Sequence, residues 1–171
     1  MRMLKGICVS IIVAVFLTAG TPNVNAFEQE GVAKGNKEIA AYLLWFKANP
    51  DDGDSFDAAV LGGTFGYFVT DPLEVGAYLQ ILNSDDITPW TLSPFVRYHF
   101  FYTPTTTPYV GGSLSFTDPD IEGEDLLLGL NLNAGVNVFM TENTAISPEL
   151  NYGIYSDYTL LTMLVQLKYF F

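Results

Sequence analysis

The last eleven residues of the chain, Leu161–Phe171, alternate between apolar side chains and a second, mostly polar set. Alternation over this length predicts a β-strand with two different faces. The apolar face finishes with Tyr169 and Phe171, which matches a lipid-facing strand whose aromatic rings lie at the level of the lipid headgroups. The alternative interpretation is an ordinary core strand of a soluble protein.

Strand-like patterns recur upstream. Seven further candidates cover residues 37–48, 57–69, 73–83, 90–101, 109–116, 126–138 and 145–155. The sixth is the most regular, with leucine, alanine and valine on one face and asparagine and glycine on the other. A face of asparagines cannot form a dry core, but it suits a hydrated or hydrogen-bonded barrel interior. An even number of strands lets both chain ends lie on one side of a closed barrel. The sequence therefore predicts an all-β protein, an eight-stranded antiparallel up-and-down transmembrane β-barrel.

The connections between these candidates fall into two classes. The odd-numbered ones hold most of the acids: Asp51, Asp52, Asp54, Asp85, Asp86, Asp118, Asp120, Glu122 and Glu124. The even-numbered ones are short turns, including a proline-flanked stretch at Thr103–Pro108. This asymmetry is typical of barrels with long outer loops and short periplasmic turns.

The amino-terminal segment has the features of a secretory leader. Arg2 and Lys5 precede an apolar run that is too short to span a bilayer, and Val24-Asn25-Ala26 offers a small-residue cleavage site. We expect a cleaved signal peptide over residues 1–26, a short periplasmic segment over 27–36, and the barrel over 37–171. Removing the leader would also remove Cys8, the single cysteine of the chain.

The charge balance excludes one class of partner. Without the leader, 7 − 2 = 5 Lys and Arg stand against 19 Asp and Glu, a formal charge of −14. A nucleic-acid-binding protein needs the opposite sign of charge. After the leader, no segment has the eighteen or so continuous apolar residues that a membrane-spanning helix requires.

Four short segments resemble a known family: Gly66–Gly76, Pro94–Tyr98, Pro108–Gly112 and Gly135–Phe139. They are similar to the strand and turn phrases of the small outer-membrane β-barrel family (OmpA/OmpX/opacity type). The resemblance covers residues 37–171 and implies an eight-stranded barrel. We expect a monomer in the bacterial outer membrane, in contact with lipids and lipopolysaccharide. The pair Tyr169 and Phe171 resembles the carboxyl-terminal signal that the barrel assembly machinery reads.

Six polar residues are predicted to point inward if the apolar faces meet lipid. They are Glu74, Arg97, His99, Glu149, Gln166 and Lys168, and the strand directions place all of them in the periplasmic half of the barrel. Buried charges are costly unless they are paired, and eight strands leave room for little more than their own side chains. We therefore expect Arg97 and Lys168 to neutralise the two glutamates in a network that fills the lumen. A narrow, gated ion or small-solute channel is the alternative.

His99 is the only histidine and raises the question of catalysis. A lipid A-modifying enzyme or a protease would need a nucleophile or an acidic dyad beside this base. Its neighbours at a spacing of two, Arg97 and Phe101, are not serines, and no acidic residue adjoins it. We expect a structural or surface-interaction role without enzymatic activity or a cofactor. A soluble periplasmic ligand-binding barrel is disfavoured by the terminal aromatic pair and by the asparagine face.

The acidic loops are the remaining candidates for ligand binding. Asp51–Asp54 and Asp118–Asp125 offer oxygen ligands of the kind that Ca²⁺ and Mg²⁺ prefer. The twelve-residue calcium loop is nevertheless incomplete, because Gly62 stands where its closing glutamate would be. Solvated loops are the simpler interpretation, and bridging to lipopolysaccharide through divalent cations is an intermediate one.

Overall fold

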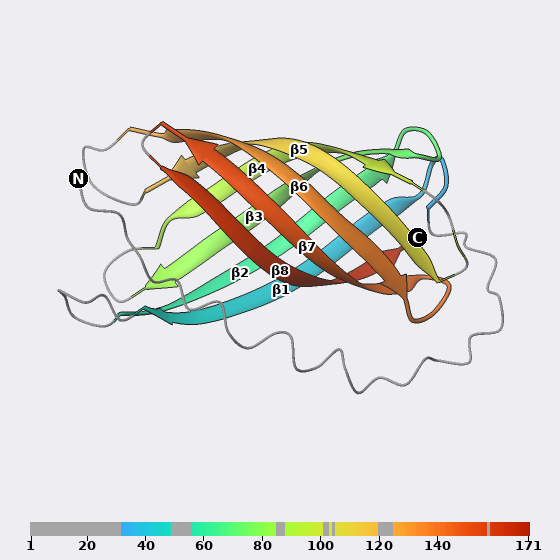
Figure 1. Ribbon diagram of the computed structural model, residues 1–171, viewed down its shortest axis with the longest axis horizontal. Helices are drawn as coiled ribbons and strands as arrows, with labels where there is room; N and C mark the ends of the chain where they lie inside the picture. Colours follow the sequence, from blue (N-terminus) through green and yellow to red (C-terminus); the bar gives the residue numbers. More distant parts are fainter. Residues whose placement is uncertain are drawn as a thin grey trace.

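The computed structural model describes residues 32–48, 56–84, 88–100, 103, 105–119, 125–156 and 158–171. Eight strands form a closed barrel in which each strand is antiparallel to its neighbours and β1 pairs with β8 (Figure 1). The strands are β1 (Lys37–Ala48), β2 (Phe56–Phe68), β3 (Leu73–Ser84), β4 (Trp90–His99), β5 (Thr106–Asp118), β6 (Leu127–Phe139), β7 (Thr144–Tyr155) and β8 (Thr159–Phe170). The predicted fold is confirmed. The predicted leader, and residues 27–31 of the segment after it, lie outside the described residues.

The pleat of each strand separates an apolar outer surface from a polar interior. In β4, for example, Val96 and Tyr98 are exposed whereas Arg97 and His99 are buried. Large apolar side chains cover the outside of the other strands in the same way, with Leu43 and Leu132 more than half exposed. A surface of this kind is stable against lipid rather than water. Within the described residues, no helix is long and apolar enough to cross a membrane.

Three predicted strands need corrected limits, and the first is β4, which ends at His99 rather than at residue 101. β5 begins at Thr106 and ends at Asp118, whereas the prediction limited it to 109–116 and treated Thr103–Pro108 as a turn. β-branched threonines favour extended backbone, and Thr106 and Thr107 find partners in Val138 and Asn137 of β6. The last strand likewise begins at Thr159, two residues before the predicted start.

The seam that closes the barrel is shorter than the other ladders. β1 and β8 form four residue pairs, from Glu38–Phe170 to Ala41–Leu167. The outer parts of both strands, from Tyr42 in β1 and up to Gln166 in β8, lack pairing with each other in the described ladder. At the other end of the seam, backbone bonds of 2.8 and 3.0 Å join Lys37 and Phe171.

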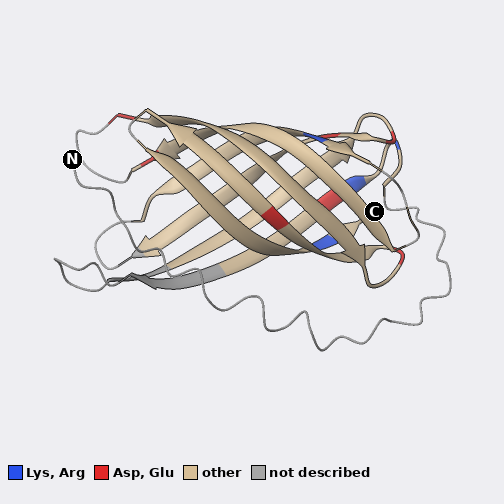
Figure 2. Ribbon diagram, in the orientation of Figure 1, with Lys and Arg blue, Asp and Glu red and all other residues tan. Residues whose placement is uncertain are grey.

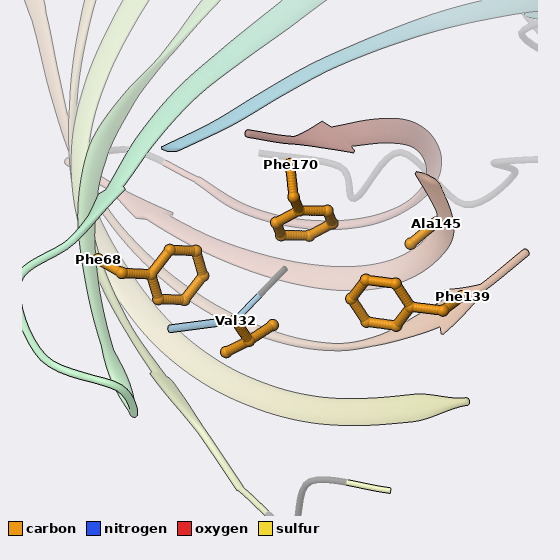
Figure 3. Packing of buried hydrophobic residues seen from close by; sticks show 5 residues of the cluster. All are labelled: Val32, Phe68, Phe139, Ala145 and Phe170. Carbon is orange, nitrogen blue, oxygen red and sulfur yellow. The ribbon is translucent and has the colours of Figure 1, made fainter. Parts of the chain in front are cut away.

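A cluster of five buried apolar residues lies at the end of the barrel that carries the short turns. Phe68, Phe139, Ala145 and Phe170 lie at strand ends and point inward, and Val32 lies among their side chains (Figure 3). We call the rings of Phe68, Phe139 and Phe170 the phenylalanine floor. The chain reaches this point through residues 32–36, which lie against the end of β2 through two backbone bonds between Gly35, Asn36 and Phe68.

Candidate functional site

The buried charged residues of the strands lie towards the end of the barrel that holds the phenylalanine floor, whereas Asp118 lies at the opposite end, where β5 ends (Figure 2). All six residues predicted to point inward are buried, with 0–1% of their surface exposed. The sequence analysis did not include four further buried residues, Glu38, Tyr42, Tyr78 and Tyr109, and it placed Asn133 in the interior without assigning it to the network. Glu38 could have been found, because it precedes the outward-facing Ile39 on the first strand.

Arg97 lies at the centre of the buried charges. Its guanidinium donates hydrogen bonds to three carboxylates, at 3.0 Å to Glu38, 3.4 Å to Glu74 and 3.2 Å to Glu149. The planar group also stacks over aromatic rings, and its Cζ lies 4.2 Å from the ring centroid of Phe95. The planar fork of arginine suits such a position, because it can satisfy several acceptors and an aromatic face at once.

The partner of Lys168 differs from the predicted one. Its Nζ donates to Glu38 at 3.1 Å, and neither Glu74 nor Glu149 forms an ion pair with it in the described structure. The cause is the register of the closing seam, where Glu38 pairs with Phe170 and Ala40 with Lys168. Glu38 thus bridges the two basic side chains. Three carboxylates and two basic groups share a space from which water is excluded.

His99 also has an acidic neighbour that the sequence did not indicate. Its Nε2 lies 3.0 Å from Glu74 Oε2, because Glu74 and Arg97 pair across β3 and β4 and His99 is two residues further on. The imidazole packs against Phe68 and Tyr109, with ring centroids 5.0 and 5.3 Å away. Neither ring nitrogen has a hydroxyl partner among the described residues. A carboxylate and a histidine are therefore present, but no serine, threonine or cysteine of the described chain is hydrogen-bonded to the imidazole as the nucleophile of a hydrolase would be.

Glu149 is held by hydroxyl groups as well as by Arg97. Tyr109 Oη donates to it at 2.7 Å and Tyr78 Oη at 3.0 Å. Tyr78 in turn accepts hydrogen bonds from Arg97 and, at 2.8 Å, from Asn133. Glu38 and Glu149 therefore have partners from several strands, and Glu74 has two partners on β4, as buried charges require.

Glycines on neighbouring strands make room for these large side chains. A Cβ on Gly66 would collide with the Glu74 carboxylate, and one on Gly76 with the backbone oxygen of Phe65 and the ring of Phe95. A Cβ on Gly135 would lie 2.5 Å from the Tyr109 ring. Glycine usually weakens a strand, but at these positions it leaves the space that the network needs inside an eight-stranded barrel.

The outer half of the lumen is polar but carries less charge. Ser93 and Ser115 share a hydrogen bond of 2.8 Å, and Thr91 and Thr117 share one of 2.9 Å. Asn131 donates to Ser115 from the asparagine face of β6. Gln166, predicted as part of the network, is fully buried, and its amide has no hydrogen-bond partner among the described residues.

The predicted cation-binding loops cannot be placed. Asp51, Asp52, Asp54, Asp120, Glu122 and Glu124 lie outside the described residues. In the part of the chain that is described, no cluster of three or more His, Cys, Asp or Glu residues is arranged to hold a metal ion.

Comparison with known families gives the context for this barrel. The family model described as "Outer membrane protein beta-barrel domain" matches residues 11–171. The chain belongs to this family. Its members' location indicates the bacterial outer membrane, and its barrel architecture agrees with the closed sheet and the lipid-compatible surface. A comparison with curated proteins finds no match.

Solved barrels of this type have the same fold. The N-terminal β-barrel domain of Pseudomonas aeruginosa OprF is 23% identical, with a TM-score of 0.64, and the match covers 81% of this chain and 98% of that one. P. aeruginosa OprG is 15% identical, with a TM-score of 0.54 and coverage of 82% and 98%. A de novo designed transmembrane β-barrel is 14% identical, with a TM-score of 0.56 and coverage of 81% and 97%. Identities this low concern the fold alone.

Proposed function

We propose that this member of the outer-membrane barrel family has a structural or surface-interaction role and that its lumen does not conduct. The observation that supports this proposal is the position of Arg97, which is fully buried and bonded to carboxylates from β1, β3 and β7. Glu38 of β1 also binds Lys168 of β8. Side chains from both edges of the closing seam and from β3, β4 and β7 therefore meet in one cluster. An ion would have to break several charge-assisted bonds to pass it.

Conductance in a planar lipid bilayer tests this proposal. We expect the refolded wild-type barrel to be silent and an Arg97→Gln/Lys168→Gln variant to be leaky or unfolded, because the substitutions remove both basic partners of Glu38. Lys34→Gln is the matched control, since Lys34 is exposed and lies outside the network. Folding of each variant is checked by its heat-dependent mobility on a denaturing gel.

A narrow channel is the second candidate, and it has an observation of its own. Hydroxyl and amide groups line the outer half of the lumen, and Tyr42, Thr64 and Gln166 have polar atoms without partners among the described residues. Such groups favour a hydrated interior. Steady wild-type channels whose ion selectivity changes with the double substitution would support this candidate and contradict the silent barrel.

An enzymatic role is not part of the proposal. His99 and Glu74 could form a base and its orienting acid, but a phenylalanine and a tyrosine ring pack against the imidazole. His99→Gln is expected to leave the lipid A profile of expressing cells unchanged. A difference in acylation between cells with the wild type and cells with this variant would restore the enzymatic hypothesis.

Export and assembly give a further prediction. We propose that Tyr169 and Phe171 act as an assembly signal, because both side chains point outward and are about half exposed, at 47% and 50%. Phe171→Ala should lower the amount of protein in the outer membrane while the refolded protein unfolds at nearly the wild-type temperature. Leu167→Ala, on the same outward face with 60% exposure, is the control. Equal outer-membrane yields for the two variants would contradict a signal at the final aromatic position.

A further inference from the structure

We infer that residues 32–36 are a tethered stopper that closes the short-turn end of the lumen and can detach without unfolding the barrel. Val32 is the residue of the stopper that enters the lumen. Its side chain is 5% exposed and lies among Phe68, Phe139 and Phe170 (Figure 3). Since these three rings come from the ends of three separate strands, their inner surfaces would face water if Val32 were withdrawn.

Three of the hydrogen bonds that attach the stopper lie close to the rim. Gly35 N donates to Phe68 O at 2.8 Å, and Phe68 N donates to Asn36 O at 2.9 Å. Lys34 N donates to the Asp71 carboxylate, in the turn after β2, at 2.9 Å. Lys34 and Gly35 are themselves exposed. A short, partly exposed segment with few contacts opens at lower free energy than the strands of the sheet.

The turn that directs Val32 inward depends on Gly35. Its φ angle is +93°, a conformation that glycine adopts readily and that residues with a side chain seldom adopt. A Cβ at this position would meet nothing within 4 Å. Gly35→Ala would therefore strain the turn without creating a steric clash. This variant tests the backbone geometry of the stopper and leaves the side chain of Val32 unchanged.

Polar groups on the lumen side of the phenylalanine floor lower the free energy needed to detach the stopper. Asn137 is two residues from Phe139 on the same inward face, and neither atom of its amide has a hydrogen-bond partner among the described residues. His99 Nδ1 also lacks one, and its ring contacts Phe68. Water that enters when the stopper detaches would satisfy these groups. The burial of Val32 therefore opposes the hydration of the groups behind it, so the closed and detached forms can be close in free energy.

The test is the reactivity of a thiol placed behind the floor. An Asn137→Cys substitution in a Cys8→Ser background provides a single thiol, and a small, membrane-impermeant methanethiosulfonate reagent is the probe. We expect slow labelling of the folded, membrane-inserted parent. Val32→Asp should accelerate labelling roughly ten- to a hundredfold, which corresponds to the burial of one valine side chain. Gly35→Ala should accelerate it less, and Ala33→Asp, with the same charge one residue away, should leave it nearly unchanged.

Heat-dependent gel mobility shows which variants retain the barrel, and only these are compared. If Val32→Asp does not fold, Gly35→Ala against the parent decides the question. Labelling that is as fast in the parent as in the folded variants would show that the segment closes nothing. Labelling that stays slow in both Val32→Asp and Gly35→Ala would show that the floor is closed without the stopper. Either result would overturn the inference.

Discussion

Replacing Arg97 by alanine is expected to lower the free energy of unfolding by about 3–5 kcal/mol, the usual cost of removing one partner from a buried ion pair. The side chain is fully buried, and its loss would leave Glu149 without a basic partner and Glu74 with the imidazole of His99 alone. Glu38 would retain Lys168 alone. The measurement is the unfolding transition of the refolded protein in detergent or lipid, followed by its heat-dependent gel mobility.

Two further variants distinguish lost charge from lost packing at this position. Arg97→Lys keeps the charge but not the planar fork, so it should recover only part of the stability. Arg97→Met/Glu149→Gln removes one charge of each sign, and it should be more stable than Arg97→Ala alone because fewer buried acids remain uncompensated. An unfolding temperature that does not change in Arg97→Ala would contradict a stabilising network.

The second large effect is expected at a glycine. Gly76→Ala should destabilise the barrel by about 1–3 kcal/mol or more, the range for overpacking a filled interior. Its new methyl group would meet the backbone oxygen of Phe65, which cannot rotate away, and the ring of Phe95 that supports Arg97. The unfolding transition measures this effect as well.

Gly63→Ala is the matched control for this substitution. Gly63 lies on β2, and a Cβ there would meet only the backbone oxygen of Ala40 within 4 Å, at 3.4 Å. We expect its effect to be small or slightly stabilising, since alanine restricts the unfolded chain more than glycine does. Equal destabilisation by the two substitutions would mean that strand propensity, rather than the tight interior, determines the cost.

The sequence was sufficient for the architecture because each strand carries its own two-residue period. The alternation in 126–138, for example, places leucine outside and asparagine inside without reference to any other strand. Inward-facing positions follow from the same period, which is why all six predicted side chains are buried. The strand limits were less certain, as β5 illustrates, because proline suggests a turn while the ladder with β6 favours extension.

Specific partners could not be predicted, because they depend on register between strands distant in the sequence. Lys168 meets Glu38 across 130 positions of the chain, and neither residue carries a local sign of the other. The contact between His99 and Glu74 likewise depends on the register of β3 and β4, which the sequence does not indicate. Val32 was also unpredicted, since a single valine in a polar, glycine-rich segment has no periodic pattern that would assign it to an interior.

Because the β1–β8 ladder is short, we expect β1 and β8 to be the first pair of strands to separate when the barrel unfolds. Its four pairs lie at the short-turn end, beside the backbone bonds between Lys37 and Phe171 and the ion pair of Glu38 with Lys168. Under tension, or as the denaturant concentration rises, the two strands should separate first at their outer ends. The short-turn end, which these bonds hold, should separate last. Amide hydrogens that face the open part of the seam, those of Leu43 and Val165, would then exchange before those of Ile39 and Leu167, which face its paired part, even though all four residues belong to the same two strands.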